Sequence, residues 1–323
     1  MRRSPLIALL AVVLLAAGAC RPVDQGGFVI DSAAPASPDS GAGSSGQPSS
    51  DAPTATMIPV IISSELAVGD NRVLFSFLDP KTQLPIGSPD LAAAVSFIAP
   101  GTTNPTAPVQ GTFVWAIEGS RGEYIAHATF PSAGSWKAIF MVQPKGGSQE
   151  AIGVPFQVVQ TPTVVWVGDH APDTKTPTLA DVGGDVRKIS TDPSPDPSFY
   201  QVSVDQALAR HQPFILVFAT PAFCKSAQCG PTLNFVKTAK TSAPSTVAFI
   251  HVEPYVLKYA NGQLQPVLDS QGNFQTTDVV NKWGLPSEPW VFAVDRNGIV
   301  QAEFEGVVSQ QELTDAITKI ASS

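Results

Sequence analysis

The chain has 323 residues and a formal net charge of −8. Because single hydrophobic cores rarely grow to this size, we expect more than one folded domain. Lys and Arg do not cluster beyond the first residues. This excludes an extended nucleic-acid-binding face, since such a face needs grouped cations.

The N-terminus has the order of an export signal. Arg2 and Arg3 precede the apolar stretch Leu6–Ala17, which is followed by Gly18, Ala19 and Cys20. The stretch is shorter than the roughly 20 apolar residues of a membrane span. Ala17–Cys20 resembles a bacterial lipobox, which implies that residues 1–20 are a signal peptide and lipobox and that Cys20 is lipidated. A plain secretory peptide is the alternative.

The lipobox resemblance implies an exported lipoprotein, anchored to the outer face of the bacterial cytoplasmic membrane or cell envelope. Residues 21–56 are rich in Ser, Pro, Gly, Ala and Asp. They have almost nothing to bury, so we expect a disordered, semi-extended linker.

Residues 57–160 alternate short runs of β-branched and aromatic residues with turn residues, which favours a β-sandwich domain. Gly122–Phe130 followed by Pro131–Trp136 indicates a hairpin, and the pattern resembles the late strands of immunoglobulin-like domains. The expected strands are Met57–Ile62, Arg72–Leu78, Ala93–Ile98, Gly111–Glu118, Glu123–Phe130, Trp136–Gln143 and Val154–Val159.

Residues 161–323 change to alternating strand and helix patterns, which predicts a mixed sheet covered on both faces. Functional groups in such sheets gather beyond the carboxyl ends of the parallel strands, where Cys224 and Cys229 fall. The expected helices are Val204–Arg210, Pro231–Thr241, Thr277–Trp283 and Gln310–Ala321, and the expected strands are Phe214–Ala219, Thr246–Val252, Trp290–Asp295 and Ile299–Glu305.

The sequence contains three cysteines. If Cys20 carries lipid, Cys224 and Cys229 remain as a pair that an oxidising compartment allows to form a disulfide. An all-helical segment would hold the two Cα atoms too far apart, so the loop must bend back or the pair stays open. Gly230 and Pro231 favour a helix that begins at Pro231.

A helix that begins there places Cys229 nearest its N-terminus, where a thiolate is stabilised, and Lys225 would add to this effect. The preceding strand favours Cys224 instead, so the identity of the nucleophile stays open.

This second half resembles the thioredoxin-like superfamily, specifically extracytoplasmic TlpA-like and AhpC/TSA-type domains. The resemblance rests on Val167–Asp173, on Phe214–Cys224 and on Gly284–Gly298. It implies an α/β thioredoxin-like fold and places Pro289 in the role of the cis-proline beside the cysteines.

Two residues depart from the pattern of that family. Phe223 stands where the family usually has a tryptophan before the first cysteine. Val217 and Phe218 stand in the preceding strand where an acid is expected. His251 and Glu253 are then the nearest candidates for proton transfer.

We expect a membrane-anchored thiol–disulfide oxidoreductase that acts on protein thiols or disulfides. One thiolate attacks a partner disulfide and the second cysteine resolves the mixed intermediate. The hypothesis needs no cofactor.

Three alternatives remain open. A peroxiredoxin-like peroxidase would use Cys229 and Ser226 after Thr220-Pro221, although Pro221 is one residue too far from Ser226 for that motif. A Sco-like chaperone would hold Cu(I) with Cys224, Cys229 and His251. A scaffold or adhesion lipoprotein would use the pair only as a structural disulfide.

Overall fold

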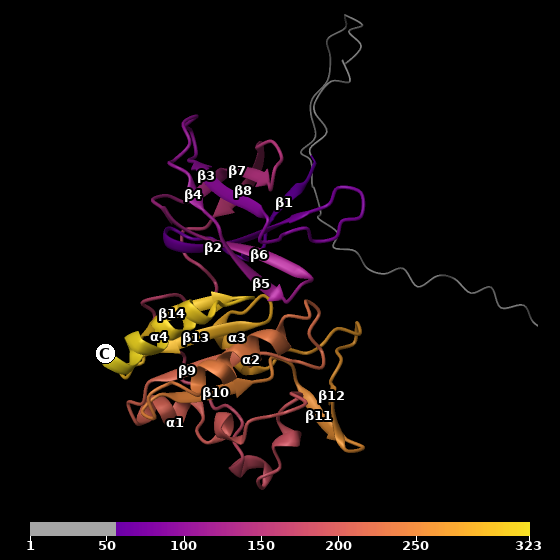
Figure 1. Ribbon diagram of the computed structural model, residues 1–323. Coiled ribbons are helices and arrows are strands. Elements are labelled where there is room, and N and C mark those ends of the chain that lie inside the picture. The colour runs from indigo at the N-terminus through magenta and orange to yellow at the C-terminus, as the bar shows by residue number, and fades with distance from the viewer. Residues whose placement is uncertain (1–55) are drawn as a thin grey trace, which may run out of the picture. The chain divides into compact units, whose positions relative to one another are not determined.

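The computed structural model describes residues 56–323, which belong to one compact unit, Pro53–Ser323 (Figure 1). The predicted signal peptide, the lipidated Cys20 and nearly all of the predicted linker lie outside the described residues. In the described part of the chain, no helix is both long enough and apolar enough to cross a membrane.

The first half of this unit consists of two four-stranded antiparallel sheets, in the orders β1-β2-β6-β5 and β4-β3-β7-β8. All seven expected strands are present, and the short β4 is an addition. The strands are β1 (Ile58–Ile61), β2 (Gly69–Leu78), β3 (Leu91–Ile98), β4 (Val109–Gln110), β5 (Thr112–Ile117), β6 (Arg121–Phe130), β7 (Gly134–Pro144) and β8 (Glu150–Val158).

An aromatic core joins the two sheets. Phe75 and Phe77 of β2 pack against Phe140 of β7 with ring centroids 5.0 and 6.0 Å apart. Tyr124 of β6 stacks on Phe75 and donates its hydroxyl to the Leu91 carbonyl at 2.7 Å. Because the buried hydroxyl has a partner, the tyrosine adds apolar area without an unsatisfied polar group.

The predicted hairpin from Gly122 to Trp136 is wrong. β6 pairs with β2 and β5, whereas β7 pairs with β3 and β8 in the other sheet. Phe130 and Trp136, on either side of the connection, meet in the shared core with centroids 5.0 Å apart. Alternation identifies the buried side chains, but it does not identify the partner strand.

The second half contains a mixed sheet of order β10-β9-β13-β14, in which only β9 and β10 are parallel. Its main elements are α1 (Val204–Ala209), β9 (Phe214–Phe218), α2 (Cys229–Lys240), β10 (Ala248–Val252), α3 (Asp278–Trp283), β13 (Trp290–Val294), β14 (Val300–Glu305) and α4 (Gln310–Ser322). Short 3-10 helices η1 (Ala180–Val182), η2 (Val186–Lys188) and η3 (Pro197–Tyr200) and the hairpin β11 (Leu257–Ala260) and β12 (Gln263–Pro266) complete it.

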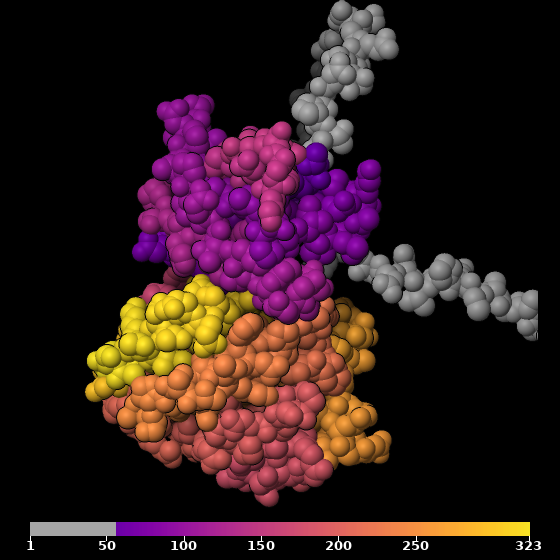
Figure 2. Space-filling model, viewed as in Figure 1, coloured from indigo at the N-terminus to yellow at the C-terminus, as the bar shows by residue number. Residues whose placement is uncertain are grey.

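Strand β9 is buried on both faces. Ile215 and Val217 face the core that contains α2 and α4, while Phe214, Leu216 and Phe218 face a second core around α3. Helices α2 and α4 contact one another and share this core, and on the surface their segments, orange and yellow, are neighbours (Figure 2). Because both faces of β9 are covered, its residues form a continuous apolar run. This run is the pattern from which the strand was predicted.

The predicted fold class needs correction. Strand accounts for 37% and helix for 18% of the described residues, and the strands form four sheets. The alternation of strand and helix patterns overstated the helical cover, because α1 and α3 have six residues each. The chain is therefore predominantly β, and an α/β thioredoxin-like domain is not supported.

Arg72 of β2 connects the first half to the last elements of the chain. Its guanidinium donates to both carboxylate oxygens of Glu312 on α4, at 2.6 and 3.3 Å. It also donates to the carbonyls of Glu305 and Val307, at 3.3 and 2.6 Å. The side chains of Arg72 and Glu312 are only 7% and 17% exposed, so the ion pair is shielded from solvent.

Replacing Arg72 by Ala should destabilise the protein by about 3 kcal/mol, because it leaves the Glu312 carboxylate buried without its partner. Urea unfolding followed by circular dichroism measures this change. The matched control is Lys145→Ala, since Lys145 and Asp90 form an ion pair whose side chains are 79% and 69% exposed. The control should change stability by less than about 1 kcal/mol. Equal effects of the two variants would contradict the role given to Arg72.

Candidate active site

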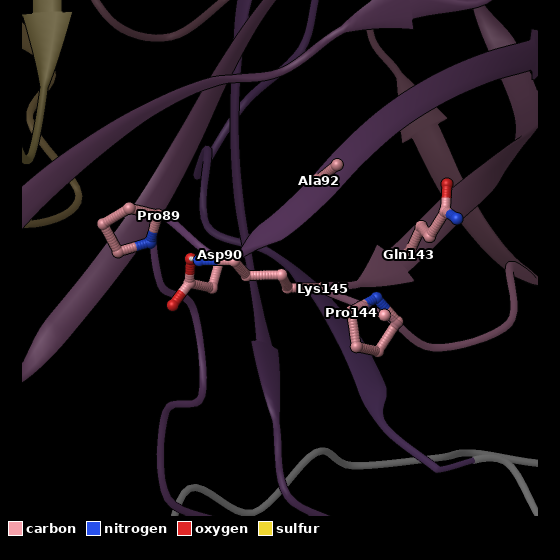
Figure 3. A pocket seen from close by; sticks show the side chains of 7 residues that line it. Pro89, Asp90, Ala92, Gln143, Pro144 and Lys145 are labelled. Atoms are coloured by element: carbon pink, nitrogen blue, oxygen red, sulfur yellow. Dashed lines mark hydrogen bonds and ion pairs between the residues drawn. The ribbon is translucent and has the colours of Figure 1, made fainter.

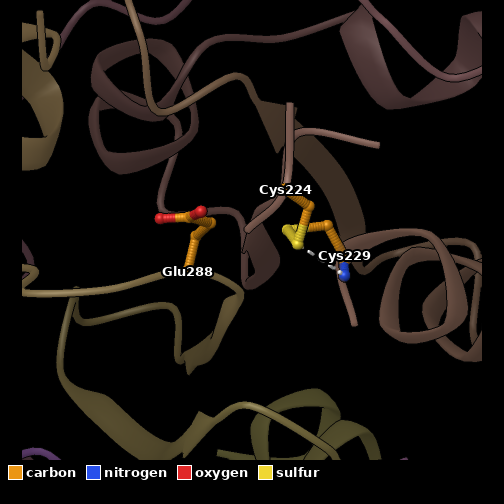
Figure 4. A group of neighbouring side chains, drawn as sticks. All are labelled: Cys224, Cys229 and Glu288. Atoms are coloured by element: carbon orange, nitrogen blue, oxygen red, sulfur yellow. Dashed lines mark hydrogen bonds between the residues drawn. A yellow bond between two sulfur atoms is a disulfide. The ribbon is translucent and has the colours of Figure 1, made fainter. Parts of the chain in front are cut away.

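The cysteine pair lies where β9 leads into α2. Cys224 and Cys229 form a disulfide whose Cα atoms are 6.0 Å apart, within the usual range for such bonds (Figure 4). The loop between them bends back through Ala227, which has a positive φ of 61°. The loop therefore bends back, as the sequence analysis required for the two cysteines to form a disulfide.

The predicted start of the helix at Pro231 is wrong, because α2 begins at Cys229 with Gln228 as its N-cap. Pro231 is then the third residue of the helix. Its missing N–H lies in the first turn, where backbone donors have no partner within the helix, so the proline does not disturb the helix.

The helix N-terminus acts on Cys224 and not on the sulfur of Cys229. The backbone N–H of Cys229 donates to Cys224 Sγ at 3.2 Å, and the Ser226 hydroxyl lies 3.3 Å from the same sulfur. Cys224 is partly exposed, whereas Cys229 is 0% exposed. The cysteine whose sulfur receives this N–H is thus also the partly exposed one.

Glu288 is the acidic neighbour of the pair, and the sequence analysis missed it. One of its carboxylate oxygens and both Sγ atoms lie within 4.8 Å of one another (Figure 4). Tyr255 donates its hydroxyl to Glu288 Oε2 at 2.7 Å, and Ser226 donates to the Glu288 carbonyl at 3.4 Å. The Glu288–Pro289 peptide is cis and lies in the loop before β13.

Lys225 was expected to stabilise a thiolate, but in the structure its ammonium lies over an aromatic ring. Its ammonium lies 5.9 Å from the centre of the Phe274 ring, which also packs edge-on against Phe223 and Tyr255. Lys225 is therefore part of an aromatic cluster beside the loop.

His251 is buried at the end of β10, and both of its ring nitrogens are occupied. Nε2 lies 2.9 Å from the Ala219 carbonyl, so it must carry the proton, and Nδ1 accepts from the Tyr200 hydroxyl. Burial lowers the pKa of His251 to about 4. The neutral, fully bonded ring is not available for proton transfer or for the predicted Cu(I) set.

Glu253 is nearly buried close to the start of the cysteine loop. Its Oε1 accepts the Thr191 N–H at 2.6 Å, while Oε2 has no hydrogen-bond partner. The Thr191 hydroxyl accepts the N–H of Ala222 at 3.2 Å, which links Glu253 to the loop. Burial raises the pKa of Glu253 to about 7. Its role in proton transfer remains a prediction.

Two residues of β6 also contact the loop, and the sequence analysis missed both. Arg121 donates to the carbonyl of Ser226 at 2.9 Å, and Glu123 accepts from the side chain of Gln228, the residue before Cys229. Glu123 is only 1% exposed and its Oε2 has no partner. An acid within a buried stretch of strand was the signal that could have identified it.

A separate hollow of about 290 Å³ lies in the first half of the unit, lined by residues of β3, β7 and the adjoining loops (Figure 3). Its charged groups are Asp90 and Lys145, the exposed ion pair named above. Nothing in this hollow resembles the buried polar groups at the cysteine loop.

Comparisons with known proteins do not identify a family. No family model and no curated protein matches the chain. A copper-bound variant of FetP from uropathogenic Escherichia coli strain F11 is 11% identical, with a TM-score of 0.22 over 28% of this chain and 72% of its own.

A putative glycoside hydrolase from Bacteroides vulgatus is 10% identical, with a TM-score of 0.20 over 68% of this chain and 36% of its own. The SrpA adhesin of Streptococcus sanguinis is 10% identical, with a TM-score of 0.19 over 71% of this chain and 96% of its own. The resemblance to the thioredoxin-like superfamily after an immunoglobulin-like domain is not supported, because the described residues are predominantly β and form four sheets.

Glu123 should make stability depend on pH. Burial raises its pKa to about 7 in the folded protein, and Arg121 opposes this only in part. Between pH 4.5 and 7 the folded state therefore binds more protons than the unfolded state, so stability falls as pH rises through this window.

Replacing Glu123 by Gln should stabilise the protein at pH 8 by up to about 3 kcal/mol and should change little at pH 4. Urea unfolding at the two pH values measures the difference. Glu118→Gln, at an exposed position of the same β5–β6 connection, serves as the control and should show no such pH dependence. A pH-independent effect of Glu123→Gln would refute the assignment.

Proposed function

We propose that the protein is a thiol–disulfide oxidoreductase in which Cys224 is the attacking cysteine and Cys229 the resolving one. The observation that carries this proposal is the asymmetry of the two sulfurs. The residue Cys224 is partly exposed and its Sγ accepts the N–H of Cys229 at the start of α2, whereas Cys229 is fully buried. Hydrogen bonds to a sulfur favour its thiolate, and the thiolate is the nucleophile.

The reaction transfers two electrons from the reduced pair to a disulfide of a partner protein. The Cys224 thiolate attacks one sulfur of that disulfide, forms a mixed disulfide and releases the other sulfur as a thiolate. Cys229 then loses its proton and attacks Cys224 Sγ. The intramolecular disulfide forms again, and the partner leaves with both of its cysteines reduced.

Glu288 helps to keep the two thiols in different states. Its carboxylate places negative charge beside the pair, which opposes the ionisation of both sulfurs at once. Cys224 ionises first because the N–H of Cys229, at the start of α2, compensates this charge there. Cys229 stays protonated until the mixed disulfide has removed the charge on Cys224.

Local geometry favours this function over two of the alternatives. A peroxidase that attacks peroxide with Cys229 would need access to a side chain that is 0% exposed. A Cu(I) chaperone that uses His251 would need a free ring nitrogen, and both nitrogens have partners. The remaining alternative, a purely structural disulfide, differs from exchange chemistry in its reduction potential.

The same proposal places the protein outside the cytoplasm, with the lipid at Cys20 as its membrane anchor. Its support is the signal-like order of residues 1–20, the Ser- and Pro-rich segment that follows, and the disulfide itself. Its substrates are then exported proteins that carry thiols or disulfides.

Replacing Cys20 by Ala should move the protein, expressed in a bacterium, from the membrane fraction to the soluble fraction. The expected cause is the loss of the acyl chains, each of whose buried CH₂ groups contributes about 0.8 kcal/mol to membrane binding. Ultracentrifugation followed by immunoblotting measures the distribution. If the variant sediments with membranes as the wild type does, the lipid-anchor assignment fails.

For the reduced protein, alkylation should modify Cys224 faster than a model thiol and should leave Cys229 protected, because only Cys224 is both accessible and hydrogen-bonded. Mass spectrometry of timed samples identifies the modified cysteine. A glutathione redox titration should give a potential above about −300 mV, the upper end for structural disulfides.

Cys229→Ser should accumulate a mixed disulfide with a substrate, and Cys224→Ser should not. The matched control, Ser242→Ala, removes a hydroxyl near the C-terminal end of α2, away from the sulfurs. If the pair resists reduction and neither cysteine reacts faster than a model thiol, the oxidoreductase function is excluded and the disulfide is structural.

A further inference from the structure

We infer that the reduced protein binds one Zn²⁺ ion through Cys224, Cys229 and Glu288. In the part of the chain that the structure describes, these residues are the group of Cys, His, Asp or Glu side chains whose ligand atoms converge. Both sulfurs and one Glu288 oxygen lie within 4.8 Å of one another. This site goes beyond the proposed function, because metal binding needs the two thiols and no exchange with a partner.

The chemistry of the three donors selects the metal. Two thiolates exclude Mg²⁺ and Ca²⁺, which take oxygen ligands. The carboxylate oxygen is a poor ligand for Cu(I), which prefers sulfur, whereas Zn²⁺ accepts sulfur and oxygen together. His251 supplies no ligand, since both of its nitrogens are hydrogen-bonded.

Glu288 is held in place for this role. Tyr255 donates its hydroxyl to Glu288 Oε2 at 2.7 Å, which orients the carboxylate beside the sulfurs. Phe274 packs against Tyr255 with ring centroids 5.1 Å apart and restricts the tyrosine ring. A hydrogen bond from outside the ligand shell that orients a carboxylate raises the affinity of a zinc site.

The backbone allows the two sulfurs to open around an ion. Two thiolates bound to tetrahedral Zn²⁺ lie about 3.8 Å apart, given a Zn–S distance of 2.3 Å. Cys229 is fixed on α2, but Cys224 belongs to the loop and can change its side-chain rotamer. The Cα separation of 6.0 Å is compatible with both the disulfide and the opened pair.

Metal and disulfide exclude each other. A dithiol of an electron-donor protein, a different protein from the disulfide substrate, reduces the Cys224–Cys229 bond and is itself oxidised to a disulfide. Zn²⁺ then displaces the two thiol protons, forms two Zn–S bonds and keeps the fourth position for water. Because Cys224 and Glu288 are partly exposed, that fourth position lies on the solvent side. Bound Zn²⁺ would protect the reduced pair from reoxidation.

The test uses the full chain, reduced and freed of reductant under anaerobic conditions, with Zn²⁺ titrated against a chromophoric chelator. The reduced protein should take up one Zn²⁺ per chain, and the oxidised protein none. Co²⁺ in place of Zn²⁺ should give thiolate-to-metal charge-transfer absorption. Glu288→Gln should weaken Zn²⁺ binding about 10-fold or more, and Tyr255→Phe should weaken it less but measurably.

Two control variants separate this site from other thiols and carboxylates. Cys20→Ala should bind as the wild type does, and so should Glu118→Gln, at an exposed glutamate outside the cluster. Circular dichroism of each oxidised variant checks that it folds. No uptake by the reduced protein, or uptake unchanged by Glu288→Gln, would overturn the zinc site.

The outcomes also separate this inference from the proposed function. If Zn²⁺ does not bind but the reduced protein still exchanges disulfides, only the zinc site fails. If Zn²⁺ binds but Cys224 is unreactive toward disulfides, only the oxidoreductase function fails.

Discussion

The described structure depends most on the ion pair and the hydrogen bonds that the buried guanidinium of Arg72 makes. One side chain of β2 satisfies the Glu312 carboxylate and the carbonyls of Glu305 and Val307, so it joins the first sheets to β14 and α4. A buried cation is tolerated only when its donors are used, and four of its hydrogen bonds go to this one region. Arg72 is thus one of the residues that join the strand-rich first half to the mixed sheet within one unit.

The cysteine loop depends on the same arrangement. Arg121 and Glu123 of β6 contact Ser226 and Gln228 within or beside the loop, while Glu288 of the loop before β13 lies near both sulfurs. The chemistry of the pair is therefore set by groups from three distant parts of the sequence. This explains why the first half, which lacks any apparent catalytic motif, still belongs to the candidate site.

Local patterns predicted the elements well and their partners poorly. The apolar runs located β9, β10 and β13 because these strands are buried on both faces. The hairpin of β11 and β12 was missed, although Asn261-Gly262 at its turn, with φ of 53° and 83°, is a strong hairpin signal. The expected hairpin of β6 and β7 is wrong because strand pairing depends on residues far apart in the chain. The thioredoxin-like resemblance rested on Val167–Asp173, Phe214–Cys224 and Gly284–Gly298, and such short local segments do not determine how many strands and sheets surround them.

The sequence by itself determined that Cys224 and Cys229 lie at a strand-to-helix turn and that a proline-containing loop precedes the last two strands. It left the order of reactivity open and favoured His251, which proved to be fully hydrogen-bonded. Only the tertiary structure decided that the N–H of Cys229 points at Cys224 and that Glu288 lies beside both sulfurs. The physical reason is that hydrogen bonds and burial depend on groups far apart in the chain, whose meeting no local pattern records.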